Sequence, residues 1–580
     1  MMIGKIEREK GKYPAYPADP VSDIREMFLK STRRFSDKIA LQSKREGRWI
    51  PIRYEELRAD VEQAAAGLAA LGLQPSISKL AIVGENRPEW AVSYLAAACT
   101  GIVCVPIDKD LKETEVYNIL YLSGAQALIG DGKHMGMISA LRARLLGLAA
   151  VVNMDETRSI DGILGFSELK RMGQARIAAG RNDFDERTVS GDQLLSILFT
   201  SGTMGNSKGV MLTHGNVASN IVEAVQWVDL RGEDRFLSVL PLHHSYECTD
   251  GFLLAIYVGA TTSYAENLRR IPENLAETRS TAMLGVPLLW HALYAKIEAA
   301  MAEKGMWKAN AAKKAAAFFE KAFGWNIRRT LFAKVHKKLG GHLRILISGG
   351  AAIDPAVAKG FRELGIEFLQ GYGLTESAPI IAVNRNRAFK DNAAGLPLPS
   401  VEVKIAEDGE VLASGPNIMN GYYNNPDGTR EALEDGWLHT GDLGYVDGDG
   451  FLYIQGRKKS VVVTPAGKKI YPEEVEAEIL KSPYISECLV WGQATDRPGE
   501  EVAIEAIVVP NREHFALQRL ENGEAFVEKF VRKEVKARCQ NLAAFKRVTK
   551  LTVRHEELEK TTTKKIKRYL YTGGRKLHTE

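Results

Sequence analysis

The chain has 580 residues, of which 45% are hydrophobic and 26% are charged, and its formal net charge is +5. This composition is ordinary for a soluble globular protein, and the length exceeds one compact core, so two or more domains are expected. A net charge this small for the length does not by itself suggest a nucleic-acid-binding protein, and we expect no nucleic acid among its partners.

The five cysteines are far apart and form no C-x-x-C pair; they stand at positions 99, 104, 248, 488 and 539. This spacing fits a reducing compartment, with neither a disulfide framework nor a zinc site. The N-terminus is charged and lacks the apolar core of a signal peptide. No window approaches the roughly 18 consecutive apolar residues of a membrane span. We expect a cytoplasmic protein, with peripheral contact on the inner face of a membrane as a further hypothesis.

Strand-like and helix-like patterns alternate through most of the chain, which predicts α/β layers. Helices are expected at 60–71 and 90–98, and strands at 79–83, 101–106 and 342–347. After about residue 400 the pattern changes to short alternating strands separated by Gly and Asp turns, at 402–405, 411–413, 443–446 and 451–454. These short strands predict a small β subdomain or barrel. Strands and helices then mix again over the last 120 or so residues, about the size of a typical domain.

The best candidate for a domain boundary is the junction GRKKS at 456–460. We therefore predict an N-terminal domain over 1–458 and a C-terminal domain over 459–580. The predicted fold class is α/β, with a large N-terminal domain of mixed α/β layers plus the β subdomain, and a smaller α+β C-terminal domain. Within the first domain, the segment 301–340 carries ten Lys/Arg against two Glu.

A short run rich in Gly, Ser and Thr follows an apolar strand-like segment, and it reads FTSGTMGNSKGV over 199–210. Glycines let the backbone turn sharply and come close to a ligand, while hydroxyls, N–H groups and a lysine donate to anionic oxygens. The run therefore suits phosphate binding. It is not a Walker loop, because Lys208 is followed by Gly209 rather than by Ser or Thr. The alternative is a flexible turn between strands.

Further motifs follow in a fixed order: PLHH at 241–244, SGGAA at 348–352, GYGLTES at 371–377, GWLHTGD at 436–442, GKKIYPEEVE at 467–476 and EKTTTKKIKR at 559–568. Together they resemble the adenylate-forming superfamily, which includes acyl-CoA synthetases, the adenylation domains of nonribosomal peptide synthetases and firefly luciferase. The resemblance covers roughly residues 25–570. It is most like the long-chain fatty acyl-CoA synthetases, on ENRPEW at 85–90, LPLHHSYE at 240–247 and the basic insertion before Ser348.

The resemblance implies a two-step reaction that uses ATP, Mg²⁺ and CoA. A carboxylate attacks the α-phosphate of ATP to give acyl-AMP and pyrophosphate, and a thiol then displaces AMP. The residues that the resemblance places on the β- and γ-phosphates are Thr200, Ser201, Gly202, Thr203 and Lys208. Thr375 is expected at the α-phosphate, and Glu376 at Mg²⁺, which prefers hard oxygen ligands. Ser207 stands where the family usually has Pro, a change expected to loosen the loop.

The nucleotide's base and sugar are assigned to other motifs of the resemblance. Gly349, Gly350, Ala351 and Gly373 are expected to bring the backbone close to the ligand, Tyr372 to stack on the adenine, Asp442 to accept from the ribose hydroxyls, and Arg457 to act on the ribose or phosphate side. For Tyr372 the alternative is a core aromatic, and for Glu376 an ordinary surface carboxylate. The run DGDG at 447–450 lacks the pattern of a calcium loop and predicts a hairpin turn.

Two catalytic residues are carried over with alternatives. His244 aligns with a family histidine beside the acyl pocket, and His243 in the same loop is the alternative. Lys565 aligns with the lysine that places an ammonium between the carboxylate and the α-phosphate, a role that suits a compact, flexible cation. Lys564 and Glu559 replace the usual Gly and Pro, so Lys564 remains a second candidate and a basic solvated tail a third interpretation.

The resemblance also implies a mobile C-terminal domain. Lys459 aligns with the hinge about which that domain moves between the two half-reactions, in keeping with hinges of a few residues at domain junctions. Gly467 is expected to line the pantetheine channel of CoA in the second pose. The acyl pocket is expected to draw on segments 244–252, 284–290 and 372–378.

The predicted activity is ligation of a long-chain fatty acid to CoA. Transfer to an acyl carrier protein is the first alternative, and a non-catalytic lipid-binding protein of the same fold is the second. Amino-acid activation is disfavoured, because neither Asp234 nor Asp250 is convincingly placed to bind an amino group and no carrier domain is expected. The basic and aromatic segment 301–340 suits an interfacial helix pair, with a packed insertion as the alternative.

Overall fold

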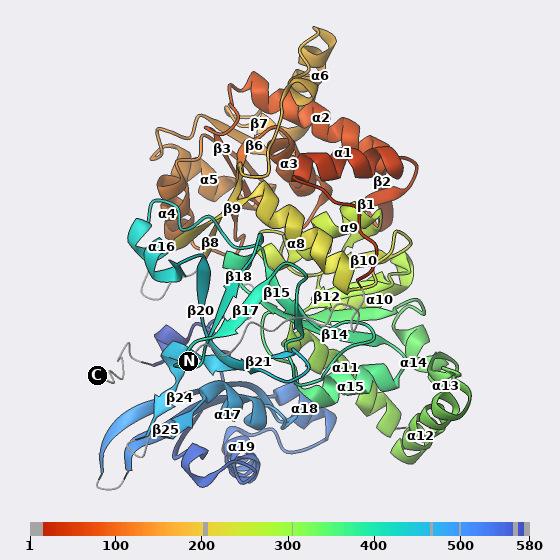
Figure 1. Ribbon diagram of the computed structural model, residues 1–580, viewed down its shortest axis with the longest axis vertical. Coiled ribbons are helices and arrows are strands. Elements are labelled where there is room, and N and C mark those ends of the chain that lie inside the picture. Colours follow the sequence, from red (N-terminus) through yellow and green to blue (C-terminus); the bar gives the residue numbers. More distant parts are fainter. Residues whose placement is uncertain are drawn as a thin grey trace. The chain divides into compact units, whose positions relative to one another are not determined.

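The computed structural model describes residues 15–200, 207–303, 305–464, 468–497, 500–560 and 566–572 (Figure 1). They form two compact units: a larger unit within Lys5–Val403 and Ala413–His439, and a smaller unit within Lys404–Leu412 and Thr440–Glu580. The predicted fold class, α/β with a large N-terminal and a smaller C-terminal part, is confirmed. The boundary at 458 stays a prediction, because packing within each unit does not show which residues act as a hinge.

One sheet of the larger unit has seven strands in the order β7-β6-β5-β3-β4-β8-β9. Its strands are β3 (Lys79–Val83), β4 (Val103–Ile107), β5 (Ala127–Gly130), β6 (Ala150–Asn153), β7 (Leu164–Gly165), β8 (Leu194–Thr200) and β9 (Lys208–Thr213). Strand β3 pairs in parallel with β4 and β5, and all three are almost entirely buried, as expected for strands covered on both faces. Strands β8 and β9 form an antiparallel hairpin whose last pair is Thr200 with Lys208.

The other sheet of the larger unit has nine strands in the order β16-β15-β14-β13-β12-β10-β11-β1-β2. Its strands are β1 (Ile39–Arg45), β2 (Arg48–Arg53), β10 (Arg235–Ser238), β11 (Thr261–Tyr264), β12 (Ala282–Gly285), β13 (Ile345–Ser348), β14 (Glu367–Gly373), β15 (Ile380–Val383) and β16 (Leu396–Pro397). Strands β10 to β14 are parallel where they pair, so their carboxyl ends meet at one edge. Ligands of open α/β sheets bind at such an edge.

Helices cover these sheets, and α1, α2, α3 and α6 pack on one another (Figure 1). They are α1 (Ile24–Arg34), α2 (Tyr54–Ala70), α3 (Pro88–Cys99), α4 (Glu113–Ser123), α5 (Met135–Arg142), α6 (Phe166–Ala178), α7 (Asp183–Glu186), α8 (His214–Trp227), α9 (Leu254–Val258), α10 (Ile271–Thr278), α11 (Pro287–Ala302), α12 (Met306–Phe323), α13 (Arg328–Leu331), α14 (Ala333–Lys338), α15 (Pro355–Glu363) and α16 (Pro426–Ala432). Local sequence explains their starts: Asp23 caps α1 by accepting the Glu26 N–H at 2.7 Å, and Asp354 with Pro355 opens α15.

A π-helix, η3 (Tyr246–Leu253), leads into α9 between β10 and β11. Such helices are rare and occur mostly at functional sites. Beside it, the core of the nine-stranded sheet is aromatic: the rings of Trp290 and Phe368 lie 5.9 Å apart, and those of Phe361 and Phe368 5.4 Å apart. The edge at which the parallel strands end is therefore backed by a rigid core.

A third sheet has the order β17-β18-β20-β19, with β21 also paired to β20; the strands are β17 (Glu402–Ile405), β18 (Glu410–Ser414), β19 (Leu433–Glu434), β20 (Trp437–Val446) and β21 (Leu452–Arg457). The rest of the smaller unit has β22 (Val462–Val463) paired with β23 (Lys469–Ile470), the sheet β24 (Ile485–Arg497), β25 (Glu500–Pro510) and β26 (Lys550–Val553), and helices α17 (Pro472–Ile479), α18 (Arg512–Leu517) and α19 (Glu524–Cys539). Phe515 and Val531 lie fully buried in its core. In the predicted β subdomain, β20 pairs antiparallel with β19 and with β21.

The predicted elements agree with the structure at β3 and β17, whose bounds coincide with the expected ones. Strand β20 begins at Trp437, six residues before the expected start. Its early part alternates between half-buried and buried residues, but Gly441, with φ +69°, obscures the strand pattern. Asp442 therefore lies within a strand rather than in a loop.

Candidate active site

The predicted phosphate loop begins and ends on the β8–β9 hairpin. Thr200 is the last residue of β8, and its hydroxyl donates to the Lys208 carbonyl oxygen at 3.4 Å. Lys208 is the first residue of β9. The candidates Ser201, Gly202 and Thr203 lie outside the described residues. The two ends of the loop are therefore held side by side by strand pairing.

Lys208 and Glu376 are brought together through Tyr422. The Lys208 ammonium lies 4.6 Å from the centre of the Tyr422 ring, over its face. The phenol hydroxyl of Tyr422 donates to Glu376 Oε1 at 2.9 Å. A cation on the ring face and a carboxylate on the hydroxyl are both favourable contacts, so the tyrosine orients both charged groups. The lysine predicted to bind phosphate and the glutamate predicted to bind the metal therefore contact the same tyrosine.

Tyr422 was not among the predicted site residues. It belongs to the turn Gly421-Tyr422-Tyr423-Asn424, in which Gly421 has φ +109°. The turn is fixed to β9, because Met211 N–H donates to the Gly421 carbonyl oxygen at 3.0 Å and Tyr423 N–H to that of Gly209 at 2.7 Å. The run Gly-Tyr-Tyr-Asn is the signal that would have pointed to a shaped turn.

Glu376 and Thr375 lie on a short 3-10 helix, Thr375–Ser377, directly after β14. The turn needs glycine at 373, because an added Cβ there would lie 1.8 Å from the Pro379 carbonyl oxygen. The Glu376 backbone is also tied down: its carbonyl oxygen accepts the Met419 N–H at 2.9 Å. Glu376 is thus held both through its backbone carbonyl and through one carboxylate oxygen.

The donor set around Glu376 fits Mg²⁺. No cluster of three or more His, Cys, Asp or Glu side chains occurs among the described residues. Mg²⁺ does not need one, since it commonly uses one or two carboxylates together with waters and substrate phosphates. An oriented carboxylate beside the hairpin that carries the predicted phosphate loop is such a partial ligand set.

The predicted adenine loop follows the buried end of β13. Gly349 N–H donates to the Gly285 carbonyl oxygen at 3.1 Å, and an added Cβ on Gly349 would lie 2.8 Å from the Tyr246 ring. Gly350 and Ala351, by contrast, are exposed. The loop therefore packs its first residue on the π-helix and presents the next two to solvent. Tyr372 is half-buried on β14, which leaves both of its interpretations open.

The two candidate histidines differ in their contacts. His243 Nε2 lies 3.6 Å from Asp108 Oδ2, and burial lowers the pKa of the His243 imidazole against the opposing effect of Asp108. His244 Nδ1 accepts the Tyr246 N–H at 3.4 Å, which leaves the ring proton on Nε2. His243 is thus engaged with a carboxylate, while His244 caps the first residue of the π-helix.

The π-helix buries two carboxyl groups, on Glu247 and Asp250, which are 1% and 6% exposed. Within the described residues, Oε2 of Glu247 and both side-chain oxygens of Asp250 have no hydrogen-bond partner. Burial raises the pKa of Glu247 to about 8, and burial together with the neighbouring Glu247 raises that of Asp250 well above its usual range. Burial therefore favours the protonated form of both groups, and a pKa of about 8 keeps Glu247 largely protonated at neutral pH.

Asp442 and Arg457 are brought together in the smaller unit. They form a directly opposed pair on the antiparallel strands β20 and β21, and Arg457 Nε lies 3.0 Å from Asp442 Oδ1. Arg457 also donates to the Thr440 carbonyl oxygen at 3.3 Å. Asp442 is buried, whereas the Arg457 side chain is half-exposed. The guanidinium therefore contacts both the buried carboxylate and solvent.

The hinge candidate Lys459 is exposed on a 3-10 turn, Lys458–Ser460. Its neighbour Lys458 is bound to Asp408 at 2.6 Å and to Glu410 at 2.7 Å, and these bonds raise the pKa of the Lys458 ammonium. Gly467, Lys564 and Lys565 lie outside the described residues, and their assignments stay predictions.

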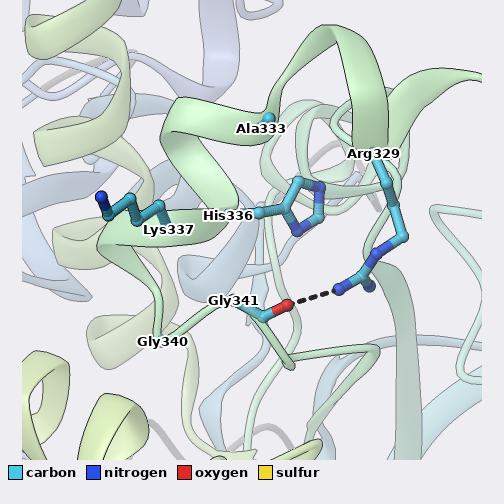
Figure 2. A pocket seen from close by; sticks show the side chains of 6 residues that line it. All are labelled: Arg329, Ala333, His336, Lys337, Gly340 and Gly341. Atoms are coloured by element: carbon cyan, nitrogen blue, oxygen red, sulfur yellow. Dashed lines mark hydrogen bonds between the residues drawn. The ribbon is translucent and has the colours of Figure 1, made fainter.

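A cavity of 280 Å³ opens in the basic segment of the larger unit; Arg329, Ala333, His336, Lys337, Gly340 and Gly341 line it (Figure 2). It contains none of the predicted site residues. The Arg329 guanidinium donates to the Gly341 carbonyl oxygen at 2.9 Å, and His336 Nε2 donates to that of Leu364 at 2.8 Å. Lys337 points away from Arg329 in Figure 2. The cavity lies at the end of α14 and offers no carboxylate for a metal.

Comparison with known proteins identifies the family of the chain. A family described as "AMP-binding enzyme" matches residues 28–423, and one described as "AMP-binding enzyme C-terminal domain" matches 474–565. The long-chain-fatty-acid–CoA ligase FadD15 of Mycobacterium bovis is 30% identical over 501 residues, which are 83% of this chain and 82% of that protein. Feruloyl-CoA synthase of an Amycolatopsis species is also 30% identical, over 79% of this chain and 83% of its own length.

A solved structure shows the same fold: the anthranilate CoA ligase AuaEII in complex with anthranoyl-AMP has a TM-score of 0.76 at 21% identity, and the match covers 96% of this chain and 98% of that one. The family match spans well over half of the chain, and the predicted resemblance to adenylate-forming enzymes is confirmed. The chain belongs to the family of AMP-binding, adenylate-forming enzymes.

Proposed function

We propose that this enzyme activates a long-chain fatty acid with ATP, through an acyl-adenylate, and transfers the acyl group to the thiol of CoA. Like its family, it uses ATP, Mg²⁺ and CoA. The observation that carries the proposal is the contact series from Lys208 through Tyr422 to Glu376 at the ends of the predicted phosphate loop. The fatty acid is proposed from the similarity to FadD15.

Each part of the site has a role in this proposal. Lys208 and Thr200 hold the departing pyrophosphate, and Thr375 contacts the α-phosphate. Tyr422 keeps the Glu376 carboxylate in place for Mg²⁺, which when bound lowers the negative charge that the attacking carboxylate meets. Donors and cations fixed where charge develops are the main source of catalysis in such transfers.

The remaining residues bind the nucleotide and organise the second step. Asp442, held by Arg457, accepts from the ribose hydroxyls, as a carboxylate can accept several hydrogen bonds. Gly349, Gly350, Ala351 and Tyr372 contact the adenine. His244 borders the acyl pocket. Lys459 is proposed as the hinge for domain motion, and Gly467 as part of the path of the CoA thiol. Lys565 is proposed to supply the cation for adenylation.

The identity of the carboxylic acid substrate is tested by measuring pyrophosphate release with a panel of acids. Saturated fatty acids of increasing length are expected to support release with ATP and Mg²⁺, and long chains are expected to give the highest kcat/KM. Each CH₂ buried in an apolar pocket adds about 0.8 kcal/mol, or about a fourfold gain in binding. Faster release with ferulate than with any fatty acid would refute the assignment of the acid but not the adenylation step.

The acceptor is tested in the same assay with CoA or holo acyl carrier protein. We expect acyl transfer to CoA to exceed transfer to the carrier protein. The reverse preference would favour the acyl carrier protein ligase. Absence of pyrophosphate release with every acid would favour a non-catalytic lipid-binding protein, although such a protein has no need to retain Glu376, Asp442 and Arg457 together.

We also propose that segment 301–340 contacts anionic membranes. Four aromatic side chains from α12 and the turn after it are exposed: Trp307 by 71%, Phe318 by 62%, Phe323 by 55% and Trp325 by 60%. Phe318 and Phe323 lie 6.3 Å apart, and Phe323 and Trp325 5.4 Å apart. In the larger unit, α12 and α13 lie at the periphery (Figure 1). Exposed, clustered aromatic groups of this size mark an interaction surface.

Charge around this aromatic cluster supports a lipid partner. Lys313 is bound to Glu363 and Arg328 to Glu320, at 2.9 Å and 2.6 Å. Lys308, Lys314 and Lys321 are exposed and have no acidic partner within the described part of the chain. Aromatic groups beside free lysines favour the interface of an anionic bilayer. None of the described helices has the length and apolar character needed to cross a bilayer.

Vesicle flotation tests this surface. The protein is expected to float with vesicles of equal parts phosphatidylcholine and phosphatidylglycerol, and much less with phosphatidylcholine alone. Replacing Trp307 and Trp325 by Ala should lower partitioning about tenfold or more, because each removes an aromatic group worth about 1.5–3 kcal/mol on burial. Tyr121→Ala is the control, since Tyr121 is 68% exposed outside this segment. Equal flotation of the double variant and the control would exclude the surface.

A further inference from the structure

Two described stretches of the smaller unit flank the segment 561–565, and they are held together. Lys560 and Ile566 form an antiparallel bridge, and Lys567 N–H donates to the Glu559 carbonyl oxygen at 2.8 Å. Ile566 packs against a small apolar cluster of Leu489, Val509 and Leu558. Both ends of the segment that contains the predicted lysine, Lys565, therefore have fixed positions on the three-stranded sheet.

The stretch that follows segment 561–565 is held in place by Arg568. Its Nη2 donates to both carboxylate oxygens of Glu476 on α17, at 2.6 Å each, and its Nη1 donates to the Val490 carbonyl oxygen at 3.0 Å. Val490 N–H in turn donates to Glu476 Oε1 at 2.7 Å. The Glu476 side chain is largely buried. One guanidinium thus links the last described stretch to a helix and to a strand, through short charge-assisted bonds.

The stretch that precedes segment 561–565 has a separate anchor on β24. The largely buried ammonium of Lys560 pairs with Glu487, which is also buried. Glu487 Oε2 accepts the Leu558 N–H at 2.8 Å. A further hydrogen bond joins the two stretches: Glu559 N–H donates to the Tyr571 hydroxyl at 2.7 Å. The two anchors share no residue, so each can be removed by substitution without changing the side chains of the other.

Glu476 and Arg568 are the last residues of two motifs, GKKIYPEEVE and EKTTTKKIKR, of which the proposed reaction uses only Gly467 and Lys565. Arg568 stands three residues after Lys565, and Glu476 lies on the helix that follows Gly467. Neither side chain belongs to the hydrophobic core cluster of this unit. A planar guanidinium bound by two oxygens fixes direction as well as distance, which an ammonium does not.

We propose that Arg568, held by Glu476, is a positioning residue for the adenylation step. By holding the chain three residues after Lys565, Arg568 supports the role that the proposed function gives this lysine in adenylation. The inference rests on the proposed function, because it takes Lys565 as the adenylation lysine. Misplacement of a catalytic group by about 1 Å can cost on the order of a hundredfold in rate.

The test compares Arg568→Lys and Glu476→Gln in the full chain with a matched control, Arg532→Lys. Arg532 is also a guanidinium bound to one carboxylate, Glu528 at 2.7 Å, and to a strand carbonyl, Leu551 at 2.9 Å. Two half-reactions are measured: acid-dependent pyrophosphate release in a single turnover, and thioester formation from supplied acyl-adenylate and CoA. Amide hydrogen exchange at Val490 and Lys567 is followed in parallel, since their N–H bonds depend on the anchor.

Both Arg568→Lys and Glu476→Gln are expected to slow adenylation about tenfold to a hundredfold with little change in KM for ATP. The thioester step should stay within about twofold, the double variant should be no slower than the worse single one, and Arg532→Lys should match the wild type. Exchange at Val490 and Lys567 should become faster only in the Arg568 and Glu476 variants.

Unchanged adenylation in Arg568→Lys overturns the proposal. Equal losses in both half-reactions, accompanied by a fall in Tm, also overturn it, because they indicate a purely structural role. If Lys565→Ala adenylates normally, the proposal fails with the lysine assignment. In that case faster exchange in Arg568→Lys would show that the anchor exists without this role, which separates the two failures.

Discussion

Lys565→Ala is expected to lower acid-dependent pyrophosphate release by about a hundredfold to a thousandfold, the usual cost of removing one group that stabilises developing charge. The acid and the α-phosphate are both anionic, and in the proposed mechanism no other side chain enters between them. Transfer from supplied acyl-adenylate to CoA should remain within a few-fold of the wild type, because that step no longer brings a carboxylate to a phosphate. A stopped-flow pyrophosphate assay and a thioester assay measure the two steps.

Lys564→Ala is the matched control for this variant, since it removes the same charge from the adjacent position. It is expected to adenylate within about threefold of the wild type, because the proposed mechanism gives Lys564 no role between the acid and the α-phosphate. If Lys564→Ala shows the loss and Lys565→Ala does not, the register of the C-terminal motif is shifted by one residue. If both variants keep full activity, the cation comes from elsewhere.

Glu247→Gln is expected to make the protein more stable at alkaline pH and to leave its stability near pH 4 almost unchanged. Glu247 is buried in the π-helix, where burial raises its pKa from 4.5 to about 8. The unfolded chain loses this proton near pH 4.5, but the folded chain keeps it until about pH 8. The folded state therefore binds more protons in this window, and the free energy of unfolding falls as pH rises through it.

The size of the effect follows from the shift. A pKa difference of this size corresponds to about 5 kcal/mol of unfolding free energy lost between pH 4.5 and pH 8, at about 1.4 kcal/mol per unit. A glutamine has nearly the same shape and no proton to lose, so the variant should show a flatter dependence by roughly that amount. The groups that face Glu247 stay in place: Ser238, Tyr264, Cys248 and Asp250.

Urea unfolding at a series of pH values measures this dependence. Glu223→Gln is the control, because Glu223 is buried but its carboxylate accepts the Ser400 N–H at 3.0 Å. The control should keep the slope of the wild type between pH 5 and 8. An identical slope in wild type and Glu247→Gln would show that Glu247 is ionised in the folded state at neutral pH.

Sequence reasoning was most successful where one local pattern decides the structure. Short buried apolar runs such as Lys79–Val83, which are rich in β-branched residues, favour central strands, and the bounds agree. The pair Asp442 and Arg457 came from two separate motifs, and strand pairing places them opposite each other. These features depend on periodicity and on motif spacing, both of which the sequence contains.

The parts that could not be predicted depend on contacts between distant segments. Tyr422 joins Lys208 to Glu376, but its role arises only when the turn at 421–424 pairs with β9. The π-helix has no sequence period of its own, and its two buried carboxyl groups read as an ordinary polar stretch. The anchor between Glu476 and Arg568 joins residues 92 positions apart. Tertiary packing, rather than local preference, decides all three.

The central claim is tested most directly by a competition in one reaction. The enzyme is incubated with ATP, Mg²⁺ and equal concentrations of palmitate and ferulate, first without and then with CoA, and the products are identified by mass spectrometry. We expect palmitoyl-adenylate in the first reaction, and palmitoyl-CoA with AMP in the second. Feruloyl-adenylate and feruloyl-CoA as the dominant products, or no adenylate with either acid, would contradict the account.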